Sequence, residues 1–155
     1  MTRVVVACGA LALHVNAIAR RRGWDVEVRP VPPELHNRPE RIRAAVEQAA
    51  DGDEVVVAYA HCGADLAGFR RFEGADCYEV YGAKHEPGVF FLTDFLVRAF
   101  DRVVVRPLGL DRYPELRELA ESAAAKLELP LEVRETGEHG LERALERLLR
   151  EESQC

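Results

Sequence analysis

Continuous apolar runs of strand length alternate with amphipathic segments along the chain. Residues 3–8 and 54–60 are apolar at almost every position, which is typical of strands covered by helices on both sides. Residues 25–31 instead alternate apolar and charged positions, the pattern of a half-exposed edge strand. We expect a further buried strand at 102–108 and a second edge strand at 131–135.

The segments between these strands have helical spacing, with proline or glycine near their expected ends. Strands that alternate with helices in this way predict a mainly parallel sheet. We therefore expect an α/β fold, with one Rossmann-like domain over residues 1–151, helices on both faces of the sheet and a tail at 152–155. The expected helices are 10–22, 39–50, 114–127 and 140–151, with a short helix or turn at 63–74, a short strand at 76–80 and an extended piece leading into a helix between 87 and 100.

The composition and net charge of the chain argue against some classes of function. The 155 residues are 48% hydrophobic and 31% charged, typical of a soluble globular protein. No apolar run approaches the roughly 18 to 20 residues that span a bilayer. The net charge of -6 argues against nucleic-acid binding, because phosphate contacts need a basic face. We expect a cytoplasmic protein that acts on a small molecule, with neither a membrane nor a nucleic acid as partner; its oligomeric state stays open.

Two of the buried runs end in the same way. VVVACG places Cys8 before Gly9, and VVVAYAHCG places Cys62 before Gly63. In an open parallel sheet, the functional crevice lies beyond the carboxyl ends of the strands. Cys77 belongs to the next unit along the chain, so we expect the three thiols to converge there as metal ligands.

Histidines and glycines complete the predicted site. His36, in the loop after the second strand, and His61 are candidates for a fourth ligand or a proton carrier. Gly9 and Gly63 would let the backbone turn sharply and approach a bound species. Thiolates with imidazoles suit zinc or the iron of an iron–sulfur cluster, and the residue types do not choose between the two.

Two other interpretations of these residues stay open. Free cysteine packs like a small hydrophobic residue, so each thiol can simply belong to the core. Alternatively, Cys8 at a helix N-terminus, with His36 or His61 as base, would make a metal-independent hydrolase or transferase. The chain has no Walker loop, no G-x-G-x-x-G, no nucleophile elbow and no C-x-x-C pair.

Five ordered blocks resemble a family of bacterial and archaeal proteins, the domain of unknown function 1638 family. The blocks are ACGAL (7–11), LHNRPE (35–40), AYAHCG (58–63), ADC (75–77) and PGVFFLT (87–93). The resemblance extends from the first strand to about residue 149, and it implicates Cys8, His36, Cys62 and Cys77.

The sequence departs from the family pattern at two positions. Ala60 stands where a glycine is usual in the family. In the ADC block, Ala75 stands in place of the histidine of the family's H-D-C pattern. If that histidine ligates or orients a metal, either His61 substitutes for it or this member has lost part of the chemistry.

The resemblance also implies a setting in corrinoid-dependent methyl transfer and one-carbon metabolism. A zinc site that binds a thiol substrate would fit that setting, because coordination makes the sulfur nucleophilic. We therefore expect a small metalloprotein, an enzyme in corrinoid-linked methyl transfer or thiol metabolism. The alternative is a noncatalytic module that carries or delivers a cofactor to a methyltransferase partner.

Overall fold

The computed structural model describes residues 2–83, 114–132 and 137–150. The chain divides into two compact units. The first comprises residues 1–84 and 138–155, and the second comprises residues 85–137. The prediction of one domain over residues 1–151 stays a prediction.

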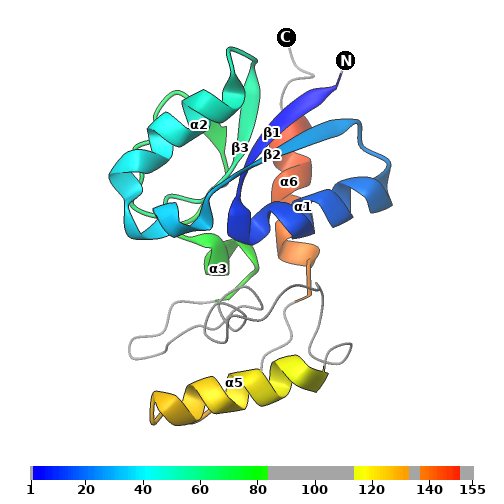
Figure 1. Ribbon diagram of the computed structural model, residues 1–155. Coiled ribbons are helices and arrows are strands. Elements are labelled where there is room, and N and C mark those ends of the chain that lie inside the picture. Colours follow the sequence, from blue (N-terminus) through cyan, green and yellow to red (C-terminus); the bar gives the residue numbers. More distant parts are fainter. Residues whose placement is uncertain (1, 84–113, 133–136, 151–155) are drawn as a thin grey trace. The chain divides into compact units, whose positions relative to one another are not determined.

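The first unit is built on a sheet of four parallel strands in the order β2-β1-β3-β4 (Figure 1). The parallel sheet with flanking helices confirms the predicted α/β class. Strand β2 lies at an edge, as its alternating pattern predicted, while β1 and β3 lie inside. The strands are β1 (Arg3–Cys8), β2 (Val26–Val31), β3 (Val55–Ala58) and β4 (Arg70–Arg71).

The valine-rich inner strands form the centre of the core. Val5 pairs in register with Val56, and Val6 with Val57. Val6 and Val57 have no exposed surface. Continuous apolar runs can be buried in this way only when both faces of the sheet are covered.

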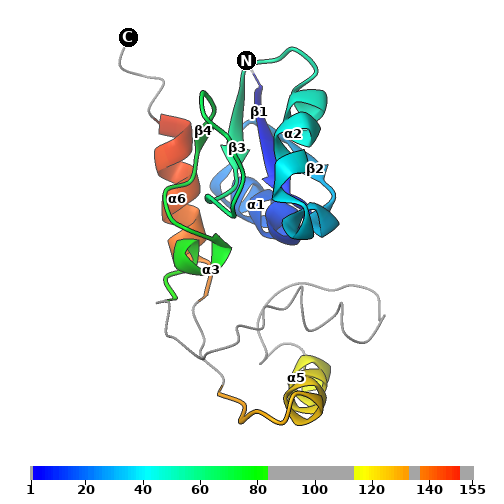
Figure 2. The ribbon, with the colours of Figure 1, turned by 90° about the vertical axis from the view of Figure 1, so that its left-hand side faces the viewer.

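Helices α2 (Ile42–Ala50) and α6 (His139–Arg150) lie on opposite sides of this sheet (Figure 2). Helix α1 (Gly9–Arg22) contacts α6, so these two share a face. Short 3-10 turns at Pro33–Asn37 and Pro39–Arg41 lead into α2. The predicted helices at 10–22, 39–50 and 140–151 are thus confirmed, apart from shifts at their ends.

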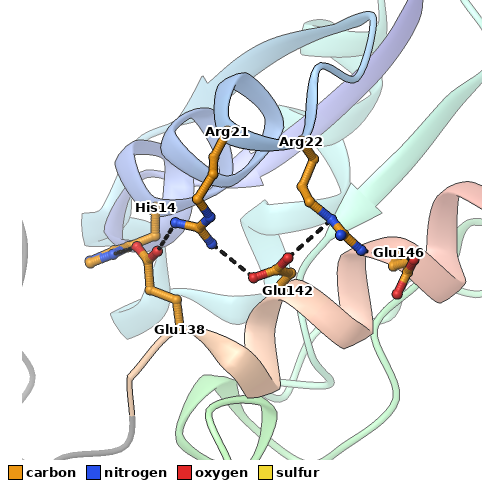
Figure 3. Close-up of polar contacts among 6 residues, drawn as sticks. All are labelled: His14, Arg21, Arg22, Glu138, Glu142 and Glu146. Atoms are coloured by element: carbon orange, nitrogen blue, oxygen red, sulfur yellow. Dashed lines mark hydrogen bonds and ion pairs between the residues drawn. The ribbon is translucent and has the colours of Figure 1, made fainter.

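A row of ion pairs joins α1 to α6 (Figure 3). Glu138, just before α6, accepts from Arg21 at 2.9 Å and lies 2.9 Å from Nδ1 of the buried His14. Glu142 pairs with Arg21 at 2.8 Å and with Arg22 at 3.0 Å. Beneath this row, apolar side chains of α6 are buried in the core: Leu141, Leu145, Leu148 and Leu149.

The described part of the second unit is helix α5 (Pro114–Lys126) with the residues that follow it. Its bounds confirm the helix predicted at 114–127. Ala120, Ala123 and Ala124 are buried. The features predicted for 87–100 and 102–108 lie outside the described residues, as does most of the edge strand predicted at 131–135.

No helix in the described part of the chain combines the length and the apolar composition that crossing a membrane requires.

Candidate metal site

Three cysteines reach one region of the first unit from three different elements. Cys8 is the last residue of β1 and is 9% exposed. Cys62 follows β3, and Cys77 is the first residue of the short helix α3 (Cys77–Val80). All three are free thiols. Cys62 and Cys77 are half-buried.

Backbone hydrogen bonds beyond the end of β3 bring Cys77 next to Cys62. Phe72 N donates to Tyr59 O at 3.0 Å. Cys62 N then donates to Ala75 O at 2.8 Å. These bonds continue the pairing of β3 with β4 past the ends of both strands. The segment after β4 is therefore held alongside the loop that carries Cys62.

Helix α3 corrects the short strand predicted at 76–80. Asp76 Oδ1 accepts from Glu79 N at 3.1 Å, and Glu79 Oε2 accepts from Ala75 N at 2.6 Å. Asp76 is thus the N-cap of α3, and the Glu79 side chain reaches back to the residue before the cap, so that both bonds satisfy free N–H groups at the start of the helix. The prediction was wrong because the D-x-x-E spacing favours a helical turn more strongly than the apolar residues of this segment favour a strand.

Cys62 lies in a tight turn between His61 and Ala64. Ala64 N donates to His61 O at 2.8 Å, and the two central residues have positive φ, 46° at Cys62 and 73° at Gly63. This is the signature of a type I′ turn. A cysteine rarely adopts positive φ. Gly63 is thus required by the turn itself, where an L side chain would be strained.

Gly9 allows a different close approach. A Cβ at this position would lie 2.7 Å from Pro33 Cδ and 2.8 Å from Val31 O. The start of α1 therefore packs directly on the segment that follows β2. The space that the missing side chain leaves is filled by the protein's own atoms.

The ionisation of Cys62 and of Cys77 responds to the neighbouring thiols. Burial, then the proximity of Cys8, raises the pKa of Cys62 to about 11. Burial, then Cys62 and Cys8, raises the pKa of Cys77 to about 12. Interactions of this kind weaken with distance, so the three sulfur atoms lie in one neighbourhood. Cys62 and Cys77 are neutral thiols at pH 7 in the metal-free protein.

Tyr59 is a neighbour of these thiols that the sequence patterns did not single out as a site residue. The residue is 1% exposed, and its hydroxyl has no hydrogen-bond partner among the described residues. Burial, then the neighbouring Cys8, raises the pKa of Tyr59 above its ordinary value, and Cys62 and Cys77 contribute as well. The signal in the sequence was a tyrosine inside the otherwise aliphatic run before His61.

The two predicted histidines lie at the surface. His36 is exposed in the 3-10 turn at Pro33–Asn37. His61 is also exposed, and its Nδ1 accepts from Gly63 N at 3.2 Å. Within the described residues, neither imidazole forms a hydrogen bond to a thiol. The structure thus brings the three cysteines together and leaves both histidines outside their hydrogen-bonding range.

The donor chemistry fits a soft metal, although the coordination shell is not closed. Thiols are the ligands that zinc and iron–sulfur clusters prefer, and three of them lie near one another here. In the described ranges, no three His, Cys, Asp or Glu side chains are already arranged to hold a metal ion together. Binding would therefore require the thiols to lose their protons and their side chains to move closer.

An open cleft of about 520 Å³ lies beside the turn that carries Cys62. Arg71 is half-buried in its wall and donates to Phe72 O at 3.0 Å. The cleft is lined by His61, residues 63–69 and Arg71.

A comparison with protein-family models assigns this chain to a family. Residues 30–121 match the family described as Protein of unknown function (DUF1638). The chain belongs to this family. The match includes His36, Cys62 and Cys77, whereas Cys8 and Gly9 precede the matched residues. Neither the curated proteins nor the solved structures yielded a match.

Proposed function

We propose that this protein binds a thiophilic metal, either zinc or an iron–sulfur cluster, through Cys8, Cys62 and Cys77. The observation that supports the proposal is the proximity of three free thiols from distant parts of the chain, with Cys8 buried and Cys62 and Cys77 half-buried. A core that needed only apolar filling would gain nothing from this arrangement, in which Cys8 makes ionisation of Cys62 harder and both make ionisation of Cys77 harder.

The elements that carry the thiols support their role as thiolates. Cys8 precedes the first turn of α1, a 14-residue helix, where the positive end of the macrodipole favours an anion. Cys62 and Cys77 are protonated at pH 7 and would release their protons on binding. A bound zinc ion would supply the positive charge that stabilises the thiolates and that makes a coordinated substrate thiol nucleophilic.

The fourth position is open to a substrate in this proposal. His36 and His61 are candidates for a fourth ligand or a proton carrier, with His61 the better placed because it precedes Cys62 and lines the cleft. The cleft beside the turn then accommodates the remainder of a small-molecule substrate. We place the activity in the cytoplasm, in thiol or one-carbon metabolism linked to corrinoid-dependent methyl transfer.

Metal titration of the purified, reduced chain tests the proposal. We expect stoichiometric zinc binding, or anaerobic assembly of a coloured iron–sulfur cluster, in the wild-type protein. Cys8→Ser, Cys62→Ser and Cys77→Ser should each lose most of the metal. The control is Cys155→Ser, which removes a cysteine outside the described residues. A wild-type protein that binds neither zinc nor an iron–sulfur cluster would contradict the proposal. A triple-serine variant, with all three cysteines replaced, that binds as much metal as wild type would contradict it as well.

Two further experiments, a pull-down and an alkylation assay, separate the rival functions. A noncatalytic delivery module would retain a methyltransferase partner in a pull-down and show no turnover of its own. A metal-independent Cys–His enzyme would show rapid alkylation of a single thiol near neutral pH. The raised pKa of Cys62 opposes Cys62 as the reactive thiol of that enzyme, because reactivity requires the thiolate.

A further inference from the structure

Tyr59 has a polar atom whose burial requires an explanation. Its ring fills the core at the end of β3, and its hydroxyl is sealed from solvent without a hydrogen-bond partner among the described residues. A buried hydroxyl without a partner destabilises a fold, whereas a phenylalanine of the same shape would not. The hydroxyl is therefore either a liability or a group that acquires its partner in another state of the protein.

The neighbours of the hydroxyl identify that state. Cys8 is the strongest electrostatic neighbour of the phenol, followed by Cys62 and Cys77. A neutral thiol is a weak hydrogen-bond acceptor. An ionised sulfur is a far better acceptor, because hydrogen bonds to charged groups are shorter and stronger. The hydroxyl thus lies beside an atom that becomes a good acceptor when it loses its proton.

We propose that Tyr59 is a positioning residue of the thiol site, whose hydroxyl donates a hydrogen bond to the Cys8 sulfur when that sulfur is a metal-bound thiolate. This inference rests on the proposed metal site. The bond holds the sulfur in one orientation and withdraws electron density from it. Hydrogen bonds from surrounding residues to metal ligands act in this way in other sites, and their loss commonly lowers metal affinity by about 10- to 100-fold.

The test compares wild type, Tyr59→Phe and Tyr81→Phe. Tyr81 is a suitable control because its ring packs edge-on against His14, with centroids 5.9 Å apart, and the same single oxygen is removed. Zinc affinity is measured by competition with a chromophoric chelator. Cobalt(II) then replaces zinc, and the sulfur-to-cobalt charge-transfer absorption reports the electron density on the thiolates. The thermal midpoint of each metal-free variant is recorded as well.

We expect Tyr59→Phe to bind zinc about 10-fold more weakly or worse, and to shift the charge-transfer absorption. Its metal-free midpoint should equal or exceed that of wild type, because the unpaired hydroxyl is gone. Tyr81→Phe should leave affinity and absorption unchanged. The opposite directions of the two Tyr59→Phe effects distinguish positioning from structural support, which would lower both.

Each contrary result overturns a different statement. Wild-type protein that binds neither zinc nor cobalt overturns the metal site, and this inference with it. Wild-type binding that Tyr59→Phe reproduces in affinity and absorption overturns the role of Tyr59 alone. A variant with a lower metal-free midpoint and an unshifted absorption spectrum shows that the hydroxyl only supports the fold, which also overturns the inference.

Discussion

Among the candidate ligands, Cys62 and Cys77 are the residues whose thiol pKa values the fold clearly raises. Both are half-buried, and burial is the largest cause of their raised pKa values. Burial disfavours the charged form of a thiol because the protein interior solvates charge poorly. The metal-free fold therefore holds protons at a pH where the unfolded chain releases them, which links stability to pH.

This linkage predicts that the metal-free protein loses stability in alkaline solution. The ordinary cysteine pKa is 9.0, and the folded values are about 11 for Cys62 and about 12 for Cys77. Between these limits the unfolded state binds fewer protons, so the free energy of unfolding falls as pH rises. The stabilisation is complete below pH 9 and is lost through pH 11 to 12. Urea unfolding of wild type and a Cys62→Ser, Cys77→Ser variant from pH 7 to 11 measures it.

The serine variant serves as the control, since other groups titrate equally in both proteins. Its stability relative to wild type should improve steadily above pH 9. Parallel pH profiles for the two proteins would show that the thiols ionise in the folded state as readily as in the unfolded chain.

Gly9 gives a second prediction for a single residue. In Gly9→Ala the new Cβ would meet Pro33 Cδ at 2.7 Å and the backbone oxygen of Val31 at 2.8 Å. A backbone oxygen and a proline ring cannot move aside easily, so we expect a loss of about 1 to 3 kcal/mol in the free energy of unfolding. Urea denaturation measures the loss. An unchanged midpoint would mean that α1 and the segment after β2 shift apart without penalty.

Element pairing explains how the site is assembled. Strand β4 comprises only Arg70 and Arg71, yet its pairing with β3 continues through backbone bonds as far as Cys62 and Ala75. The apolar patterns of 63–74 predicted a short helix or turn and missed this strand, because two charged residues carry no strand periodicity. Their pairing depends on the neighbouring strand rather than on their own sequence.

The ion pairs between α1 and α6 give a prediction about helix packing. Glu138 contacts His14, which is 7% exposed, in addition to Arg21. Glu142 contacts only the arginines Arg21 and Arg22 among these residues, and their side chains are 49% and 41% exposed. Glu138→Gln weakens the charge-assisted contact to a buried ring and should lower stability by about 1 to 3 kcal/mol. Glu142→Gln should lower it by roughly 1 kcal/mol or less, because exposed pairs contribute little.

Urea denaturation of both variants at low and high salt checks this order. The Glu142→Gln effect should shrink further at 1 M salt, where exposed charges are screened. Equal effects at low salt would mean that His14 gains no more from its carboxylate than the surface arginines do.

On the scale of the whole molecule, the candidate site lies at the carboxyl ends of β1 and β3, with α3 at the same end of the sheet (Figure 1). A metal at this point would tie β1, the loop after β3 and α3 to one another. Because the unfolded chain presents no such site, the binding free energy would add to the stability of the folded state.

We therefore expect zinc to raise the thermal midpoint of the wild-type chain. At a free concentration of 100 times Kd the gain is about 2.7 kcal/mol in the free energy of unfolding. The gain should fall at acidic pH, since binding must displace the thiol protons. Differential scanning calorimetry at several zinc concentrations and at two pH values measures both effects. A midpoint independent of zinc in the wild type would argue against the site, and a shift retained by the triple-serine variant would place the metal elsewhere.

The amino-acid sequence determined the buried strands, most helices and the position of Cys8 and Cys62 near strand ends, because apolar periodicity and chain order are local properties. Membership of the family was also readable from the ordered blocks, from 35–40 onward. Only the tertiary structure decided that the segment after β4 pairs beside Cys62 and that Cys77 begins a helix next to it. It also decided that the Tyr59 hydroxyl is buried near the thiols, with no hydrogen-bond partner in the described part of the chain. These features depend on which segments, far apart in the sequence, pack against each other. A hydrophobic pattern specifies which face of an element is buried, but it does not specify which residues that face will contact.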